Sequence, residues 1–437
     1  MNTARTLFPG AMGPDGFISC FDHLLDDSIL RRKLILKGGP GVGKSTFMRR
    51  VHAALCANGE PSTLYFCSGD PDSLDGVAVP HAGLLILDGT APHIVDPEIP
   101  GARDSIINLG ECLNEPAMRP RLPHIRACMG DHAACSRRAR ACLAAAAALA
   151  KANAATLFAA TDQARLWAMT QALVQAVLSR DAPKESAPAV RPVITDALTP
   201  KGEISLIGEN APPRVIRLLF HWGMDGTPVL RRLSAAVQAA GYSVEEHLCP
   251  LVPGRLLHLT IPALATLVTT GEQLSAEQSF DFAACLPQGA LLRHECALEQ
   301  GRAGIQLHLH RASAALAQAK QLHDELESFY VPNMDFEKWQ ADSVAMSVDF
   351  YGPFIHDLEN KIFVVEHSGN AACQISPLLG FEVEKQIVRI GEMEWESDGT
   401  RCDFMLDVDL IPNGSYELSC EVFARTNNGT VAGQVGA

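Results

Sequence analysis

Length, composition and charge restrict what kind of protein this chain is. At 437 residues it is too long for one ordinary domain, and its 47% hydrophobic content with scattered charge predicts two or three soluble globular domains. The N-terminus lacks the apolar core of a secretory signal, the longest apolar stretch (142–150) is too short for a membrane span, and no basic patch would follow a phosphate backbone. The thirteen cysteines contain no C-x-x-C pair and are interpreted as reduced, buried side chains rather than a metal site. We therefore expect a cytoplasmic protein without nucleic-acid or membrane partners.

A glycine-rich segment directly behind the apolar run 34–36 carries the main functional signal. It matches the phosphate-binding motif G-x-x-x-x-G-K-[ST] and consists of Gly38, Gly39, Pro40, Gly41, Val42, Gly43, Lys44, Ser45 and Thr46. Glycines let consecutive backbone N–H groups turn toward one anion, and a helix beginning near Lys44 adds its positive dipole end. Lys44 would reach the β- and γ-phosphates, and the Ser45 hydroxyl would bind Mg²⁺. The motif predicts a nucleoside triphosphate site.

An acidic loop follows the strand predicted at 64–67. It contains Asp70, Asp72 and Asp75, and loops of this kind lie beside the ligand crevice in doubly wound sheets. Each carboxylate is a candidate for the catalytic base or for a group that binds a ligand of Mg²⁺. Of the three, Asp72 is the one predicted as a catalytic residue. Capping of the turn explains each of them equally well.

A second apolar run, 84–87, ends in Asp88, which is the form of a Walker B strand. Asp88 would hold Mg²⁺ through its water shell, opposite Ser45. Many motor-type ATPases place a glutamate directly after this aspartate, but this chain has Gly89, so the group that polarises the nucleophile must come from another loop. Arg103, in the next proline-containing loop, is a candidate for an arginine finger, although it also fits a solvated surface position.

The first third of the chain repeats, without a gap, 182 residues later. A segment nearer the N-terminus repeats with an offset of 186, so that Pro14 meets Pro200. In this register 43–45, Gly-Lys-Ser, corresponds to 225–227, Asp-Gly-Thr, and the lysine is lost. The second copy should fold like the first, bind triphosphate weakly or not at all, and pack against the first as a pseudo-dimer.

The remaining segments complete the expected architecture. Alanine-rich helices are predicted at 125–179 and 297–329, with a polar linker at 181–192. From residue 342 onward the net charge is −11, against −3 before it. There the segments 402–410 and 416–424 alternate apolar and polar residues around a turn at 412–415, which predicts a β-hairpin in a small antiparallel β domain.

The predicted fold is α/β, with two tandem P-loop NTPase-type parallel-sheet domains that carry helical extensions. The expected boundaries are 1–180 for the active domain, 190–340 for the degenerate second domain, and 343–437 for the acidic β-rich domain. Together they predict one ATP and Mg²⁺ site in the chain.

The segments 34–46, 67–77 and 87–93 resemble an uncharacterised bacterial family with two tandem P-loop halves. The resemblance covers about residues 8–340. Members are described only as ATPase or nucleotide kinase-like. The resemblance implies a P-loop fold and ATP binding at 38–46 but no particular substrate. Two departures are the lost lysine at Gly226 and the acidic β-rich tail.

Three functions fit these observations. The favoured one is a Mg²⁺-dependent ATPase that acts as a switch or regulator, because a kinase would gain little from a retained inactive copy. The second is a small-molecule or nucleotide kinase, and the third is a nucleotide-binding scaffold without turnover. The absence of a guanine-specific motif favours ATP. A protein partner could bind the degenerate half or the β-rich tail.

Overall fold

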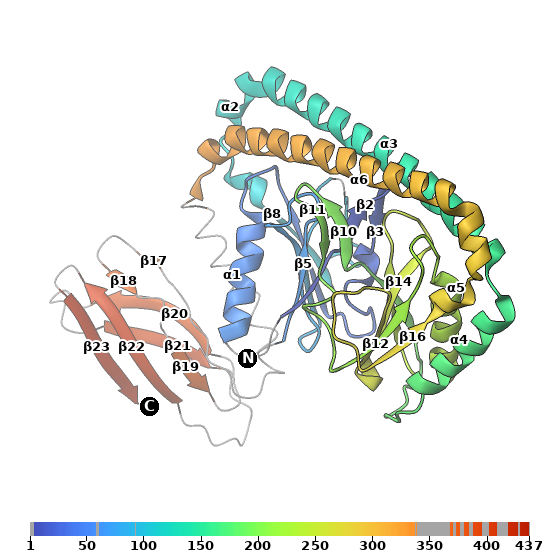
Figure 1. The fold of residues 1–437 in the computed structure, drawn as a ribbon. Coiled ribbons are helices and arrows are strands. Elements are labelled where there is room, and N and C mark those ends of the chain that lie inside the picture. The colour runs from blue at the N-terminus through green and yellow to red at the C-terminus, as the bar shows by residue number, and fades with distance from the viewer. Residues whose placement is uncertain are drawn as a thin grey trace.

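The computed structural model describes residues 4–57, 61–91, 93–336 and 338 and, beyond them, the strands β17–β23. Up to residue 336 the chain forms two six-stranded sheets and two long helices that lie side by side along both sheets (Figure 1). The chain is therefore α/β, as the sequence predicted, but its two large sheets are mixed with mostly parallel strands, whereas purely parallel sheets were expected.

The first sheet has the strand order β1-β5-β6-β7-β4-β8, and only β6 among them is antiparallel to its neighbours. Its strands in chain order are β1 (Arg5–Leu7), β4 (Arg32–Lys37), β5 (Thr63–Phe66), β6 (Leu74–Val79), β7 (Leu84–Asp88) and β8 (Asp104–Asn108). Helix α1 (Lys44–Ala57) follows β4. Leu34 packs on the α1 side and Ile35 on the other side, because successive residues of a strand face opposite sides of the sheet.

The second sheet repeats the first strand for strand, in the order β9-β13-β14-β15-β12-β16. Its strands are β9 (Val190–Val193), β12 (Arg214–Leu219), β13 (Val244–Leu248), β14 (Leu256–Ile261), β15 (Thr266–Thr269) and β16 (Gln278–Asp281), with helix α5 (Thr227–Ala239) after β12. The ladder irregularity after Tyr65 in β5 recurs after His247 in β13, at the same offset of 182. A shared topology down to a bulge is strong support for duplication.

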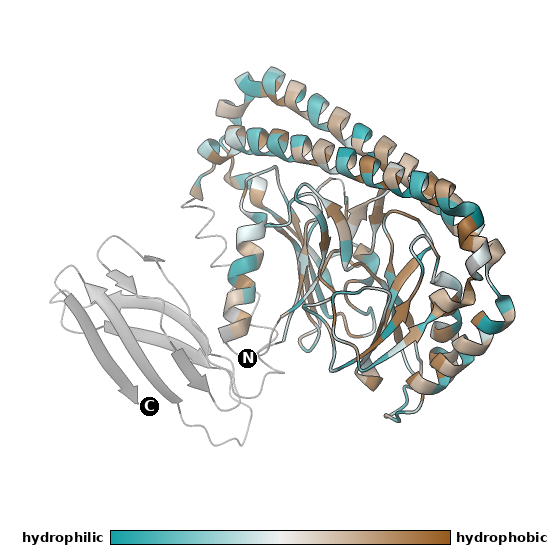
Figure 2. Ribbon diagram, in the orientation of Figure 1, coloured by the Kyte–Doolittle hydropathy of each residue, from teal (hydrophilic) through white to brown (hydrophobic). Residues whose placement is uncertain are grey.

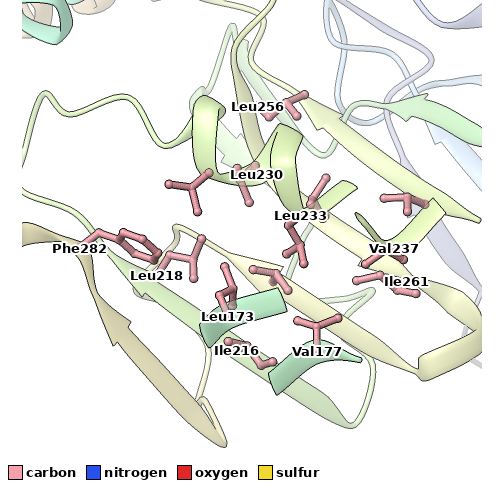
Figure 3. Packing of buried hydrophobic residues seen from close by; sticks show 14 of the residues in the cluster. Leu173, Val177, Ile216, Leu218, Leu230, Leu233, Val237, Leu256, Ile261 and Phe282 are labelled. Carbon is pink, nitrogen blue, oxygen red and sulfur yellow. The ribbon is translucent and has the colours of Figure 1, made fainter. Parts of the chain in front are cut away.

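Each sheet is closed by helices that bury its apolar face. At the second sheet, Leu230, Leu233 and Val237 of α5 and Leu173 of α4 (Gln163–Val177) share one hydrophobic cluster with Ile216 of β12 (Figure 3). Figure 2 shows that brown, hydrophobic residues gather on the strands of both sheets. Part of the predicted linker 181–192 belongs to β9, where Pro192 is tolerated because β9 is an edge strand.

The two long helices are α3 (Leu122–Ala160) and α6 (Gln288–Tyr330), and they run antiparallel to each other. The predicted helical region 125–179 is interrupted at Thr161, and α4 begins after the N-cap Asp162, whose carboxylate accepts from the Arg165 N–H.

By length and composition alone the helical run Glu115–Ala160 could cross a membrane. In the structure Ala139 and Leu143 of this run pack against Ala312 and Leu316 of α6, so its apolar stripe has a partner within the protein.

The described C-terminal strands pair only antiparallel. They are β17 (Ser368–Gly369), β18 (Cys373–Ile375), β19 (Gly380–Val383), β20 (Val388–Trp395), β21 (Cys402–Val408), β22 (Leu418–Thr426) and β23 (Gly429–Gly436). The predicted hairpin is wrong, because β21 pairs with β20 while β22 pairs with β18, β19 and β23. Alternation specifies the faces of a strand but not its partner. The predicted turn at 412–415 lies outside the described residues.

Candidate functional site

The phosphate-loop sequence follows β4 at the carboxyl edge of the first sheet, between β7 and β8. Gly38, Gly41 and Gly43 have φ angles of 146°, 68° and 89°, in the region that strains residues with a β-carbon. The Val42 side chain is fully buried between them and anchors the loop to the core. The left-handed glycines curve the backbone around the buried Val42 side chain, and a backbone curved in this way can point its N–H groups at an anion.

Lys44 and Asp88 meet at this loop. The Lys44 ammonium donates to the carbonyl oxygens of Gly38 (3.0 Å) and Gly39 (2.9 Å), and its Nζ lies 3.6 Å from Oδ2 of Asp88. The other carboxylate oxygen of Asp88 accepts from the Thr90 N–H at 2.8 Å. The cation and the carboxylate that the sequence assigned to one site are therefore adjacent.

The Ser45 hydroxyl has a structural bond of its own. Its Oγ accepts from the Leu74 N–H at 3.0 Å, which ties the first turn of α1 to the start of β6. Thr227 makes the equivalent bond to the Leu256 N–H at 3.0 Å in the second copy. A hydroxyl has two lone pairs, so Ser45 retains one for a metal, while the tie to the strand explains why the second copy keeps a hydroxyl.

Asp72, a predicted catalytic residue, is placed in an ion pair between the copies. Its exposed carboxylate accepts from Lys201 at 2.8 and 2.6 Å. Lys201 lies in the tight turn between β10 (Asp196–Thr199) and β11 (Gly202–Ser205) of the second copy. Hydrogen bonding to Lys201 lowers the pKa of Asp72, which makes the carboxylate a poorer base. Asp72 therefore makes a contact between the copies, and its role as a catalytic base stays a prediction.

The other two aspartates of the acidic loop also have partners. Asp70 accepts from the Ser73 hydroxyl at 3.0 Å and lies 3.3 Å from the ammonium of Lys320 in α6. Asp75 is buried, and its Oδ2 lies 3.4 Å from Nε2 of His93. The His93 ring stacks on Phe21, with ring centroids 4.7 Å apart.

Arg103 lies at the opposite edge of the sheet and cannot act as an arginine finger. Its carbonyl oxygen accepts from the Lys33 N–H at the amino end of β4, and its guanidinium contacts Asp104, Glu98 and Asp27. A strand of five residues separates this point from the loop, or about 15 Å. The sequence identified the loop before β8 as a possible source of an arginine finger. Only the direction of β8, which is parallel to β4, shows that this loop lies at the edge of the sheet opposite the glycine loop.

The loop of the second copy is filled by its own carboxylate. Oδ1 of Asp225 accepts from the Thr227 N–H at 2.9 Å, and Oδ2 lies 3.3 Å from Nε of Arg255. The adjoining cavity has a volume of about 10 Å³, room for no more than one water. Its lining includes Phe158 of α3 and Met224. The Asp225 carboxylate thus already takes up an N–H group at the start of α5 that would otherwise face a phosphate.

Sequence reasoning missed the residues that α6 brings to the glycine loop 38–46. A β-carbon at Gly39 would lie 2.6 Å from the Tyr330 ring, and one at Gly41 would lie 2.7 Å from Val331 and 3.4 Å from Glu327. These residues are almost 300 positions away in the sequence and carry no motif, so no local signal could reveal them.

No family model, curated protein or solved structure matches the chain. The candidate site therefore depends on the chemistry and geometry of its own residues.

Proposed function

We propose that the chain binds ATP with Mg²⁺ at residues 38–46 and hydrolyses it as a switch or regulator. The observation that carries the proposal is the approach of Lys44 to Asp88 beneath a loop of left-handed glycines. This is the arrangement that a triphosphate with a divalent cation requires. ATP would supply the phosphoanhydride bond, and the loop N–H groups, Lys44, Ser45 and Asp88 would hold its phosphates and cation.

We further propose that both sheets are P-loop-type domains and that only the first is active. The strand order supports this, because β4, which precedes the loop, lies next to β7, which ends in Asp88. The carboxylate of Asp225, which already accepts from an N–H group of its own loop, argues against a second nucleotide. The antiparallel pairing of the C-terminal strands supports the proposal of an acidic β domain. This domain and the second copy are the two parts of the chain that we propose for binding a protein partner.

The structure favours hydrolysis over transfer to a small acceptor. A kinase of the kind considered above needs a free carboxylate in the acidic loop. Asp70 and Asp72 are paired with Lys320 and Lys201, and Asp75 is buried with its Oδ2 3.4 Å from Nε2 of His93. Both lysines belong to the second copy. These ion pairs link the loop beside the proposed nucleotide site to the second copy. Such a link is what a switch needs, because nucleotide binding or hydrolysis must change contacts elsewhere in the chain.

The proposal is tested by titrating the full chain with a non-hydrolysable ATP analogue and Mg²⁺ in a calorimeter, and by measuring phosphate release from ATP. Lys44→Ala should abolish both, because each charge-assisted bond to phosphate contributes about 1.5–3 kcal/mol. Lys201→Ala is a matched control that removes a lysine from the second copy and should keep binding. Unchanged affinity in Lys44→Ala would refute the assignment. Binding without phosphate release would indicate a scaffold, and release only with a metabolite acceptor would indicate a kinase.

A further inference from the structure

The C-terminal end of α6 and the residues that follow it contact loops at the carboxyl edge of the first sheet, from β5 to β8. Lys320 lies 3.3 Å from Asp70 after β5, Tyr330 packs on Gly39 after β4, and Met334 pairs with Leu113 after β8. The last three turns of α6 therefore contact loops at this edge, although α6 belongs to the second copy.

The contact of Tyr330 explains a glycine that phosphate binding does not need. Gly39 occupies a variable position of the motif, and its φ is not in the left-handed region, so its backbone could carry any residue. A β-carbon there would approach the Tyr330 ring to 2.6 Å, well inside van der Waals contact. Gly39 is therefore required by the tyrosine and not by the phosphate.

The second copy provides an internal comparison. Asn153 and Leu157 of α3 lie 174 residues before Glu327 and Val331, and they pack on Gly223, the equivalent of Gly41. Each long helix thus covers the loop of the other copy. The position equivalent to Tyr330 is Thr156, however, and the position equivalent to Gly39 is a histidine. The tyrosine-on-glycine contact accompanies the loop that has kept its lysine.

We infer that the C-terminal end of α6 is a clasp that completes the nucleotide site from the second copy, with Tyr330 as its positioning residue. The inference rests on the proposed binding of ATP at 38–46. With the clasp docked, Gly38, Gly41 and Gly43 already have the left-handed conformation that an anion requires. Docking therefore preorganises the loop, and by thermodynamic linkage a bound nucleotide stabilises the docked clasp to the same degree.

The test measures nucleotide affinity and amide hydrogen exchange on the full chain. Tyr330→Ala should weaken binding of the ATP analogue about fivefold or more, within the usual range of coupling between sites. Tyr330→Phe should bind like wild type, because the ring makes the contact. In wild type the nucleotide should slow exchange at 322–331, and in Tyr330→Ala it should not.

Two further variants distinguish a clasp from a general loss of structure. Gly39→Ala should weaken binding like Tyr330→Ala, and the double variant should bind no worse than either single one, because both changes remove the same contact. Thr156→Ala, the matched change in α3, should leave affinity unchanged.

The outcomes separate the two proposals. If wild type does not bind nucleotide, the proposed function fails. If wild type binds, Lys44→Ala does not, and Tyr330→Ala binds with unchanged affinity and unchanged protection of α6, the clasp is wrong while the nucleotide site stands. Additive losses for Gly39→Ala and Tyr330→Ala would also overturn the clasp.

Discussion

Phe8 and Ile194 pair through their backbones between the two copies. The Phe8 N–H donates to the Ile194 carbonyl oxygen over 2.9 Å, and the two residues form an isolated antiparallel bridge. They are equivalent positions, because the N-terminal segments of the copies are offset by 186 residues. A residue that contacts its own equivalent lies on a two-fold axis. The copies are thus arranged as a symmetric dimer within one chain, in agreement with the pseudo-dimer expected from the repeat.

The contact between the copies should contribute strongly to stability. Phe8 is 1% exposed, so Phe8→Ala should lower the free energy of unfolding by about 3–5 kcal/mol through the lost burial and the cavity. The measurement is urea unfolding followed by circular dichroism. Phe336→Ala, at a 45% exposed position, is the control and should have a small effect. A Phe8→Ala chain as stable as wild type would show that the copies fold without this contact.

Asp88→Asn should separate metal use from nucleotide binding. The carboxylate next to Lys44 is the group placed to hold the water shell of Mg²⁺, whereas the loop N–H groups and the bonds from Lys44 to Gly38 and Gly39 do not involve it. We expect measurable nucleotide binding that no longer depends on magnesium, together with a large loss of phosphate release. The check is a magnesium titration of both activities. Equal hydrolysis by wild type and variant across the titration would exclude this role for Asp88.

The second copy should bind no nucleotide, so each chain should bind one. Gly226→Lys alone should not restore a site, because Asp225 still occupies the loop and a β-carbon at Gly226 would lie 2.7 Å from the Phe220 ring. The measurement is the stoichiometry of the non-hydrolysable analogue. A single site that disappears in Lys44→Ala is expected, and two equivalent sites per chain would contradict the prediction.

Arg103 should matter for stability and not for nucleotide. The Asp104 side chain is completely buried beside it, so Arg103→Ala leaves a buried carboxylate without its main partner and should cost about 3–5 kcal/mol. Affinity for the ATP analogue, measured at a temperature where the variant is folded, should be unchanged. A variant with normal stability but no phosphate release would restore the arginine-finger interpretation.

The same aspartate gives a pH dependence with a defined sign. Burial alone would raise the pKa of Asp104, but hydrogen bonds from Arg103 and from the N–H groups of Ile99 and Glu98 outweigh it and lower the pKa to about 2. Because the folded pKa lies below the unfolded value of about 3.9, this stabilisation of about 2–3 kcal/mol is present above pH 4 and is lost as the pH falls toward 2. Asp104→Asn should flatten this part of the stability curve, as measured by urea unfolding at pH 2 to 5. If the free energy of unfolding of Asp104→Asn fell between pH 5 and pH 2 as steeply as that of wild type, this prediction would be wrong.

Local patterns were sufficient for what depends on neighbours in sequence. The glycine motif placed Lys44 at the start of a helix, and the apolar run before Asp88 placed that carboxylate at the end of the adjacent strand. The ungapped offset predicted a second sheet with the topology of the first. These features follow from periodicity and from residue types with specific backbone preferences.

What the sequence could not provide depends on direction and on distant contacts. Arg103 lies before β8 in the chain, and only the parallel pairing of β8 with β4 shows that it lies at the edge remote from Lys44. The partner of Asp72 is a lysine more than a hundred residues away. The approach of Tyr330 to Gly39 arises from the packing of two helices across the duplicated sheets, and no spacing in the sequence encodes it.

The reciprocal exchange of long helices limits how the chain can be divided. Gly41 is covered by α6 and Gly223 by α3, so neither half keeps its own helix over its own loop. A chain cut between the copies would leave each half with an uncovered loop and with a long helix that has lost its packing partner.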